Sequence, residues 1–308
     1  MAERTSYTCL LDADKIPQLK RDLQARGFEF REVPYAHFGA MSESEKVNIA
    51  VYTSGKLVIQ GKGTTDFIQF YLEPQLLGEA RLGYEHILDP TMLERRIGVD
   101  ESGKGDFFGP LVIAGVFVDE AAARNLMELG VRDSKLIKSD ARIAEMAKEI
   151  RTSTGCVTDV VAIGPEKYNQ LHARMRNVND ILGWGHARVI ENLLARVDSP
   201  KAISDQFGNK RIIDSALMER GRKIQLVQRH KAESDLAVAA ASIIARDEFV
   251  TRLRKLGKEQ GVALPKGASA AVQEAAIQLV AKHGRDVLGK VAKTHFRTTQ
   301  KVLEGAPK

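Results

Sequence analysis

Hydrophobic and polar positions along the chain follow either helical spacing or the alternation of a strand. The order of the helices and strands that they predict indicates the domain organisation. In the first 85 residues they predict strands at 5–11, 28–33, 47–53 and 56–60 and helices at 14–25 and 64–77. The order β-α-β-β-β-α is typical of a compact α+β module. We predict a first domain over residues 1–85, a linker over 86–91 and a second domain over 92–308.

Strands and helices alternate through the second domain. Strands are predicted at 95–100, 111–118, 159–163, 201–204 and 224–228, and helices at 121–129, 141–151, 186–195, 212–220 and 236–245. Because a chain that alternates strands with helices builds an α/β sheet, we predict an α/β fold for this domain.

The composition is that of an ordinary soluble protein, with 44% hydrophobic and 28% charged residues in a chain of 308. No stretch approaches the roughly 18 uninterrupted apolar residues that a membrane span needs, and the start lacks a secretory pattern. Cys9 and Cys156 lie far apart and outside any metal-ligand spacing, so they are expected to be reduced packing residues. We expect a cytoplasmic protein.

Positive charge is concentrated in the second domain. The whole chain carries 46 Lys and Arg against 40 Asp and Glu, for a net charge of +6 and a pI near 9.2. Residues 1–85 hold 10 basic and 12 acidic residues, which leaves 36 and 28 for the rest. This distribution favours a polyanionic partner for the second domain.

Acidic residues follow predicted strands at the positions where α/β sites usually lie. Asp100 and Glu101 end one strand, and Asp205 follows the apolar run of another. Asp235 opens a very apolar helix. Four carboxylates gathered at one sheet edge would repel each other unless cations were bound, and Mg²⁺ or Mn²⁺ prefers such oxygen ligands. The pattern therefore indicates a magnesium-type site.

Two such ions about 4 Å apart would support phosphodiester hydrolysis by water without a His or Cys nucleophile. A structural interpretation exists for each acid taken alone. Asp205 is also typical of a turn, and Asp235 of a helix N-cap favoured by the helix dipole. Spacing alone leaves both interpretations open.

The turn after Asp100 also invites comparison with a phosphate-binding loop, because residues 98–104 satisfy G-x-x-x-x-G-K. The match fails at Gly105, which lacks the hydroxyl that would bind Mg²⁺, and the adjacent acids would repel a phosphate. A P-loop nucleotide hydrolase is therefore disfavoured. Gly103-Lys104-Gly105 could instead bring backbone groups close to a ribose 2′-hydroxyl, the alternative being a tight turn with a solvated lysine.

One long motif resembles a known family. Residues 98–111, Gly-Val-Asp-Glu-Ser-Gly-Lys-Gly-Asp-Phe-Phe-Gly-Pro-Leu, resemble the signature of the type 2 ribonucleases H, specifically the ribonuclease HIII class. Further segments agree in order along the chain: Asp133-Ser134-Lys135, Asn177-Val178-Asn179, Ile203–Phe207, Lys231–Asp235, Ala239–Arg246 and Pro265–Ala268. The similarity spans roughly residues 92 to 300.

The resemblance implies an endoribonuclease that hydrolyses the RNA strand of RNA/DNA hybrids, leaving 5′-phosphate and 3′-hydroxyl ends. It implies a ribonuclease H-like mixed five-stranded sheet flanked by helices, and two Mg²⁺ or Mn²⁺ ions during catalysis. The four residues that match the family's catalytic carboxylates are Asp100, Glu101, Asp205 and Asp235. Of these, Asp100, Glu101 and Asp205 are the predicted metal ligands.

The resemblance also assigns substrate contacts. The family reads the 2′-hydroxyl through a turn that maps onto Gly103, Lys104 and Gly105, and Lys135 resembles a phosphate-contacting residue. The related HII class has a sugar-sensing tyrosine in its C-terminal region, whereas here Ala268 follows Lys266-Gly267. This difference predicts poor cutting at a lone embedded ribonucleotide.

Family members carry an N-terminal domain that resembles the TATA-binding-protein fold and grips the hybrid, and residues 1–85 are compatible with it. Because this segment is slightly acidic, a gripping surface must be a local patch, for which Lys46, Lys56 and Lys62 are candidates. The hybrid is the expected partner, with a monomer and no obligate protein partner. A nucleic-acid-binding protein without catalysis remains the alternative.

Two further residues stand out. Trp184, between two glycines, is expected to be a packing residue rather than a platform for base stacking. His295 lies among basic residues and is interpreted either as a phosphate contact or as part of a solvated helix end.

Overall fold

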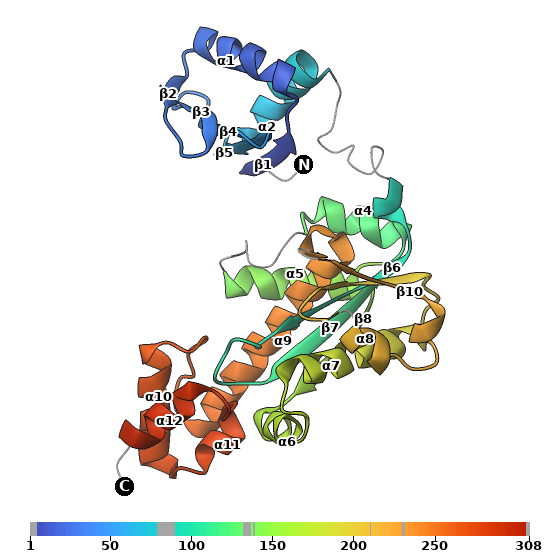
Figure 1. Cartoon of the computed structure of the whole chain (residues 1–308), viewed down its shortest axis with the longest axis vertical. Coiled ribbons are helices and arrows are strands. Elements are labelled where there is room, and N and C mark those ends of the chain that lie inside the picture. The colour runs from blue at the N-terminus through green and yellow to red at the C-terminus, as the bar shows by residue number, and fades with distance from the viewer. Residues whose placement is uncertain are drawn as a thin grey trace. The chain divides into compact units, whose positions relative to one another are not determined.

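The computed structural model divides the chain into two compact units, Met1–Thr91 and Met92–Lys308 (Figure 1). It describes residues 5–78, 90–131, 137, 139–209, 211–229 and 232–305. The predicted border at residue 85 and most of the predicted linker 86–91 lie outside these ranges. Each unit has its own hydrophobic core and is described by itself.

The N-terminal unit contains an antiparallel five-stranded sheet in the order β1-β5-β4-β3-β2. Its strands are β1 (Ser6–Leu10), β2 (Glu29–Arg31), β3 (Ala36–Ser42), β4 (Val47–Tyr52) and β5 (Lys56–Gln60). Its helical segments are η1 (Ala13–Lys15), α1 (Ile16–Ala25), α2 (Thr64–Phe67) and η2 (Ile68–Leu77). The expected small α+β domain is present.

The predicted order β-α-β-β-β-α omitted β3 and is wrong by one strand. The segment Ala36–Ser42 contains two alanines and a glycine, residues that are depleted in strands, so its pattern is weak. Its partners β2 and β4 make it a strand. Gly39 is needed there, because a Cβ at this position would lie 2.6 Å from Cγ2 of Val33.

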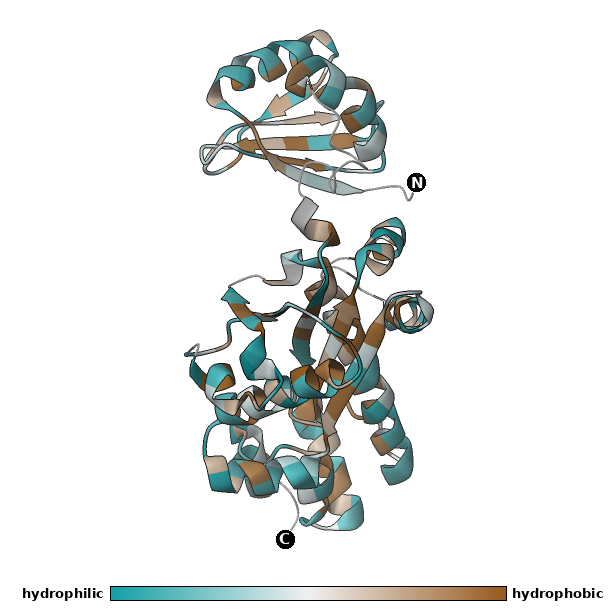
Figure 2. Ribbon diagram, turned by 90° about the vertical axis from the view of Figure 1, so that its right-hand side faces the viewer, coloured by the Kyte–Doolittle hydropathy of each residue, from teal (hydrophilic) through white to brown (hydrophobic). Residues whose placement is uncertain are grey.

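Helices cover one face of this sheet (Figure 2). Leu19 and Leu23 of α1 and Ile68 and Leu72 of η2 are fully buried in the same core as the inward-facing strand residues. Along β5, buried Leu57 and Ile59 alternate with more exposed neighbours. Within the described part of this unit, no helix covers the other face.

The C-terminal unit contains a mixed five-stranded sheet in the order β10-β9-β6-β7-β8. Its strands are β6 (Arg96–Ser102), β7 (Leu111–Val118), β8 (Val157–Ile163), β9 (Lys201–Asp205) and β10 (Gln225–Arg229). β6, β9 and β10 run parallel, while β7 is antiparallel to both β6 and β8. The predicted α/β fold with a mixed five-stranded sheet is confirmed.

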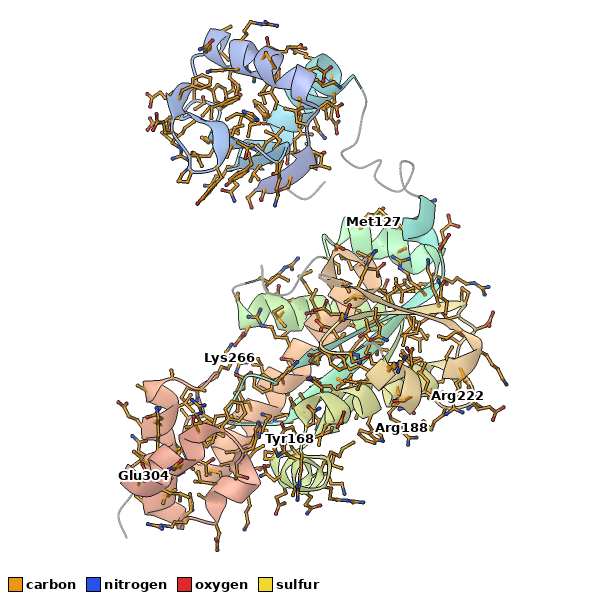
Figure 3. All side chains as sticks on the ribbon, in the orientation of Figure 1. Met127, Tyr168, Arg188, Arg222, Lys266 and Glu304 are labelled. Atoms are coloured by element: carbon orange, nitrogen blue, oxygen red, sulfur yellow. The ribbon has the colours of Figure 1, made fainter. Side chains whose placement is uncertain are left out.

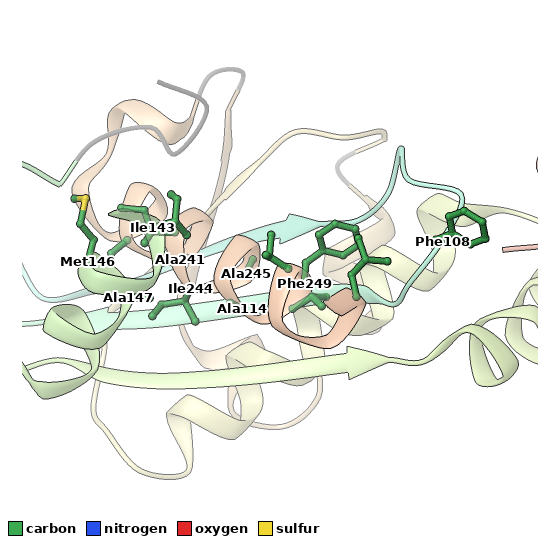
Figure 4. Close-up of a cluster of buried hydrophobic side chains, with 14 of the residues drawn as sticks. Phe108, Ala114, Ile143, Met146, Ala147, Ala241, Ile244, Ala245 and Phe249 are labelled. Atoms are coloured by element: carbon green, nitrogen blue, oxygen red, sulfur yellow. The ribbon is translucent and has the colours of Figure 1, made fainter. Parts of the chain in front are cut away.

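Helices flank both faces of this sheet. They are α4 (Glu120–Glu128), α5 (Asp140–Thr152), α6 (Pro165–Met175), α7 (Val178–Leu194), α8 (Arg211–Ala216) and α9 (Leu236–Gln260), followed by α10 (Ala270–His283), α11 (Val287–Val291) and α12 (Arg297–Gly305). Short 3₁₀ turns are η3 (Pro90–Leu93), η5 (Gly221–Lys223) and η6 (Ala232–Ser234). One core joins α4, α5 and α9 to one face, where Ile143 and Met146 lie near Ala241 and Ile244 (Figure 4). A second core joins α7 to the other face.

Small residues let α9 approach the sheet very closely. A Cβ at Gly98 of β6 would lie 2.1 Å from the carbonyl carbon of Ala237, a distance that no side chain tolerates. The first turn of α9 therefore lies directly against β6. This contact brings Asp235, which immediately precedes α9, next to the strand that carries Asp100.

Candidate active site

The parallel register of β6 and β9 aligns two of the predicted acids. Val99 pairs with Ser204, so Asp100 and Asp205 are the next residues along two adjacent strands and project to the same face. That face is the α9 side, because Ile203, two residues before Asp205, packs with Val238 of α9. Asp205 is the last residue of β9, so its interpretation as a turn residue is wrong.

We call this region the acidic edge. It comprises Asp100, Glu101, the turn Gly103–Asp106 and Asp205.

Asp235 is held beside the acidic edge by two sets of hydrogen bonds. Its Oδ1 accepts from the backbone N–H groups of Ala237 at 2.8 Å and Val238 at 3.3 Å, so the N-cap interpretation is confirmed. Its Oδ2 accepts from Arg96 Nε at 2.8 Å, and the two side chains are only 9% and 2% exposed. Asp235 is therefore part of a buried ion pair as well as a helix cap.

Glu101 points to the opposite, α7 side of the sheet. Its Oε2 lies 3.1 Å from Nε2 of His186, a fully buried residue in the middle of α7. The other ring nitrogen of His186, Nδ1, lies 3.0 Å from Oγ of Ser204, the residue before Asp205. His186 was not identified from the sequence. Its only signal is a polar ring within a mostly apolar helix.

The donor set fits a hard divalent cation by its chemistry, because it consists of carboxylate oxygens at adjacent strand ends. As the side chains stand, no group of three or more His, Cys, Asp or Glu residues in the described ranges is arranged to hold a metal ion. Asp235 bonds Arg96 and the α9 backbone, and Glu101 bonds His186. The acids converge by strand register but do not surround one point.

The two glycines of the turn after β6 have different roles. Gly103 has φ +91°, and a Cβ there would lie 2.3 Å from the carbonyl oxygen of Pro110, so only glycine fits. A Cβ at Gly105 would meet nothing within 4 Å. Between them, Lys104 has its Nζ 3.9 Å from Oε1 of Glu101 and 5.5 Å from the ring centre of Phe207. The turn therefore requires glycine at position 103 and has free space beside Gly105.

Asp106 ties this turn to distant segments. Its Oδ1 accepts from the N–H of Gly267 at 2.6 Å, which anchors the Lys266-Gly267 loop. The fully buried Lys293 donates from Nζ to the carbonyl oxygens of Asp106 and Gly109, both at 2.8 Å. Burial lowers the pKa of Lys293 to about 7, an effect that the charge of Asp106 opposes. Asp106 therefore has a structural role beside the acidic edge.

Comparison with known proteins agrees with this arrangement. The family model described as Ribonuclease HII matches residues 97–299. The Ribonuclease HIII of Protochlamydia amoebophila (strain UWE25) is 41% identical over 303 residues, which cover 98% of each chain. The Ribonuclease HIII of Chlamydia caviae is 43% identical over 291 residues, or 94% of each chain.

The chain belongs to the ribonuclease HIII family.

Solved structures of ribonuclease HIII proteins resemble it over nearly its whole length. Bst-RNase HIII in complex with Mn²⁺ is 30% identical with a TM-score of 0.66, and the match covers 97% of this chain and 98% of that one. Aquifex aeolicus RNase H3 is 25% identical with a TM-score of 0.56, covering 94% and 100%. A second family model, Domain of unknown function (DUF3378), matches residues 8–77. The N-terminal unit is thus shared with other proteins.

Several other expectations for this ribonuclease HIII can be compared with the structure. Lys135 lies outside the described residues. Trp184 is 39% exposed, with the guanidinium carbon of Arg188 5.9 Å from its ring centre, so its side chain is partly packed. No described helix is long and apolar enough to cross a membrane.

His295 is exposed and belongs to a cluster of stacked rings. Its ring stacks on His172 with centres 4.2 Å apart and lies 5.5 Å from the ring centre of Tyr168, which is labelled in Figure 3. Burial, followed by the charges of His172 and Lys293, lowers its pKa to about 4. A neutral imidazole still has one N–H that can donate to a phosphate, so the phosphate contact stays a prediction.

The three lysines suggested as one gripping patch are divided. Lys46 and Lys62 lie near each other at one end of the N-terminal sheet, where the N–H of Gly63 donates to the carbonyl oxygen of Lys46 at 3.2 Å. Lys56 begins β5 and lies at the opposite end of that strand. All three side chains are exposed, so their part in gripping the hybrid stays a prediction.

Proposed function

We propose that this chain is an endonuclease that hydrolyses the RNA strand of RNA/DNA hybrids and leaves 5′-phosphate and 3′-hydroxyl ends. The alignment of Asp100 with Asp205 beside the Gly103-Lys104-Gly105 turn carries the proposal. It unites an acidic site for phosphodiester chemistry with a backbone surface open to a ribose. Relatives named Ribonuclease HIII support it.

We infer that Asp100, Glu101 and Asp205 would hold two Mg²⁺ or Mn²⁺ ions, with Asp235 as the fourth catalytic carboxylate. The similar Bst-RNase HIII was solved with Mn²⁺, which supports a divalent metal. When bound, such ions supply activation of a water molecule and neutralisation of charge on the leaving oxygen. None of the four carboxylates forms a covalent bond with the substrate in this scheme.

The chain's own residues would position these groups. Asp235 is fixed by Arg96 and the α9 backbone, so its carboxylate cannot turn without breaking a buried ion pair. Lys104 is part of the turn at the acidic edge, where its positive charge would attract the negatively charged backbone of the substrate. Water remains the nucleophile.

Recognition of RNA is assigned to the turn Gly103-Lys104-Gly105. The open space at Gly105 supports close approach of a sugar, and the close contact of Gly103 with the carbonyl oxygen of Pro110 supports a turn that only glycine can form there. Lys135 remains a proposed phosphate contact. Since the chain carries Ala268 after Lys266-Gly267, we propose weak cleavage at a lone embedded ribonucleotide.

The N-terminal unit is proposed to grip the hybrid with the uncovered face of its sheet. Thr8, Val58, Ala50, Gly39 and Arg31 are paired in one row across all five strands and lie on that face by alternation. Their mostly small side chains leave room for a duplex to approach. The row ends at a cation, which would meet a phosphate.

We also propose that the protein acts in the cytoplasm as a monomer. No obligate protein partner is needed, since each proposed contact with metal or hybrid comes from this chain.

A substrate panel tests the proposal. The full chain is incubated with end-labelled RNA/DNA hybrid, double-stranded RNA and a DNA duplex with one ribonucleotide, with Mg²⁺ or Mn²⁺. We expect efficient cutting of the hybrid only. A protein that only binds nucleic acid would retain the hybrid in a gel and leave it intact. A nucleotide hydrolase would instead release phosphate from ATP without nucleic acid.

A further inference from the structure

From the α7 side of the sheet, the imidazole of His186 bonds to residues at the ends of β6 and β9. It is 0% exposed, and Nε2 lies 3.1 Å from Glu101 on β6 while Nδ1 lies 3.0 Å from Ser204 on β9. The ring also packs against Phe207, with ring centres 4.9 Å apart. Each hydrogen-bond partner is a predicted metal ligand or the immediate neighbour of one.

In the hydrogen bond between His186 and Glu101, the donor is the same for either orientation of the Ser204 hydroxyl. The hydroxyl of Ser204 has a single hydrogen, for which both Nδ1 of His186 and the carbonyl oxygen of Asp205, 3.1 Å away, compete. If Ser204 donates to Nδ1, a neutral ring carries its proton on Nε2. If Ser204 donates to the carbonyl, Nδ1–H donates to Ser204, and Nε2 must still carry a proton to approach a carboxylate. In both cases Nε2–H donates to Glu101.

We propose that His186 is a positioning residue that holds the carboxylate of Glu101 at the end of β6 and couples it to the end of β9. The proposal rests on the proposed function, because it assumes that Glu101 is a metal ligand. Glu101 projects to the α7 face while Asp100 and Asp205 project to the α9 face. A glutamate with three rotatable bonds would otherwise lose side-chain entropy whenever metal binds.

Packing alone does not account for this histidine. Other buried residues of α7 that face the sheet, such as Ile181, Val189 and Leu193, are apolar, and burying a polar ring is costly unless its nitrogens are bonded. Here both nitrogens are bonded, and both bonds lead to the acidic edge. The outer partners of metal ligands commonly serve this purpose.

Four variants test the proposal. His186→Leu removes both hydrogen bonds, whereas His186→Gln keeps an amide N–H that can reach Glu101. Ser204→Ala removes only the partner of Nδ1. The matched control is Asn192→Ala, which removes another bond from α7 to a strand carboxylate, Asn192 Nδ2 to Asp159 Oδ2 at 2.9 Å, outside the acidic edge.

Mn²⁺ binding to the full chain without nucleic acid is measured by calorimetry, beside kcat and KM on the hybrid and a thermal melt. We expect His186→Leu to weaken Mn²⁺ binding by about tenfold or more and to lower kcat with little change in KM. His186→Gln should recover most of the loss, and Ser204→Ala should lose a few-fold. Asn192→Ala should lower only the melting temperature.

Unchanged or tighter Mn²⁺ binding in His186→Leu overturns the proposal, as does an equal loss in Asn192→Ala. If His186→Leu fails to fold, wild-type Mn²⁺ affinity in Ser204→Ala overturns it instead. The proposed function fails separately. A wild-type chain that binds Mn²⁺ with the expected pattern of variants but leaves the hybrid intact keeps the role of His186 and loses the nuclease.

Discussion

The acidic edge and the uncovered sheet face of the N-terminal unit are built in opposite ways. At and beside the acidic edge, buried polar groups hold several of the functional residues: Arg96 bonds Asp235, His186 bonds Glu101, and Lys293 bonds the backbone carbonyl of Asp106. The N-terminal face is a sheet surface crossed by the row of residues from Thr8 to Arg31. Catalysis needs groups fixed to fractions of an ångström, whereas gripping a charged duplex needs an accessible surface.

The two regions should therefore respond differently to substitution. Changes at the acidic edge are expected to remove turnover, and changes in the N-terminal unit to alter affinity and its dependence on salt. The predictions below proceed from the largest effect to the smallest.

Removal of one carboxylate charge at the edge should have the largest effect. Asp100→Asn and Asp205→Asn are each expected to reduce cleavage of the hybrid by about 10³-fold or more, because a ligand charge for the proposed ions is lost. Affinity for the hybrid should change little. Single-turnover cleavage and a gel shift measure the two quantities, and Asp286→Asn, an exposed acid elsewhere, is the control. Cleavage at the wild-type rate in either variant contradicts the assignment.

Variants of the Arg96–Asp235 pair distinguish effects on stability from effects on catalysis. Arg96→Met should cost about 3–5 kcal/mol of unfolding free energy, because it leaves a buried carboxylate without its main cation. Asp235→Asn should be destabilising for the reciprocal reason and should also abolish cleavage. The double variant is expected to regain stability in urea unfolding but no activity. Recovery of cleavage in the double variant would falsify a chemical role for Asp235.

Deletion of residues 1–85 should weaken binding of the hybrid about tenfold and leave kcat at saturation nearly unchanged. The physical reason is the loss of phosphate contacts without any change at the acidic edge. Affinity is measured over a range of salt concentrations, where each lost phosphate contact should reduce the slope of log K against log salt by ~0.9.

Equal affinity and equal slope with and without the segment count against the gripping role. Lys46→Gln with Lys62→Gln gives a finer comparison with Lys56→Gln, because the first two lie at one end of the sheet and the third at the other.

Lys293 should make stability depend on pH. Burial lowers its pKa to about 7 in the folded state, below the value of about 10.4 in an unfolded chain. Between these values the unfolded state binds more protons, so stability should rise with pH by up to about 1.4 kcal/mol per unit. Lys293→Met should lack this slope in urea unfolding from pH 7 to 10. Parallel profiles for both proteins would show that Lys293 keeps its ordinary pKa.

Strand ends, turns and apolar patterns were readable from the sequence, and so were Asp100, Glu101, Asp205 and the glycine turn. Their signals are local, since each consists of neighbours along the chain. The resemblance to ribonuclease HIII extended these signals to a family and a fold, both of which are confirmed.

Helices α6, α10, α11 and α12 were not predicted, and several other features that were missed depend on distant partners. β3 is a weak strand that its neighbours complete, and the pairing of Arg96 with Asp235 joins residues 139 positions apart. His186 and Lys293 are separated from Glu101 and Asp106 by 85 and 187 positions. No local pattern reveals such a contact, because it depends on strand register and on which helix covers which face.

Product analysis of a single reaction tests the central claim most directly. Wild-type protein and Asp205→Asn are incubated with an RNA/DNA hybrid labelled in the RNA strand, with Mn²⁺ or Mg²⁺ and with chelator. The account predicts internal cleavage of the RNA by wild type only with metal, fragments that carry 5′-phosphate and 3′-hydroxyl ends, and none from the variant. An intact RNA strand with wild type and either metal, or fragments with 3′-phosphate ends, would contradict it.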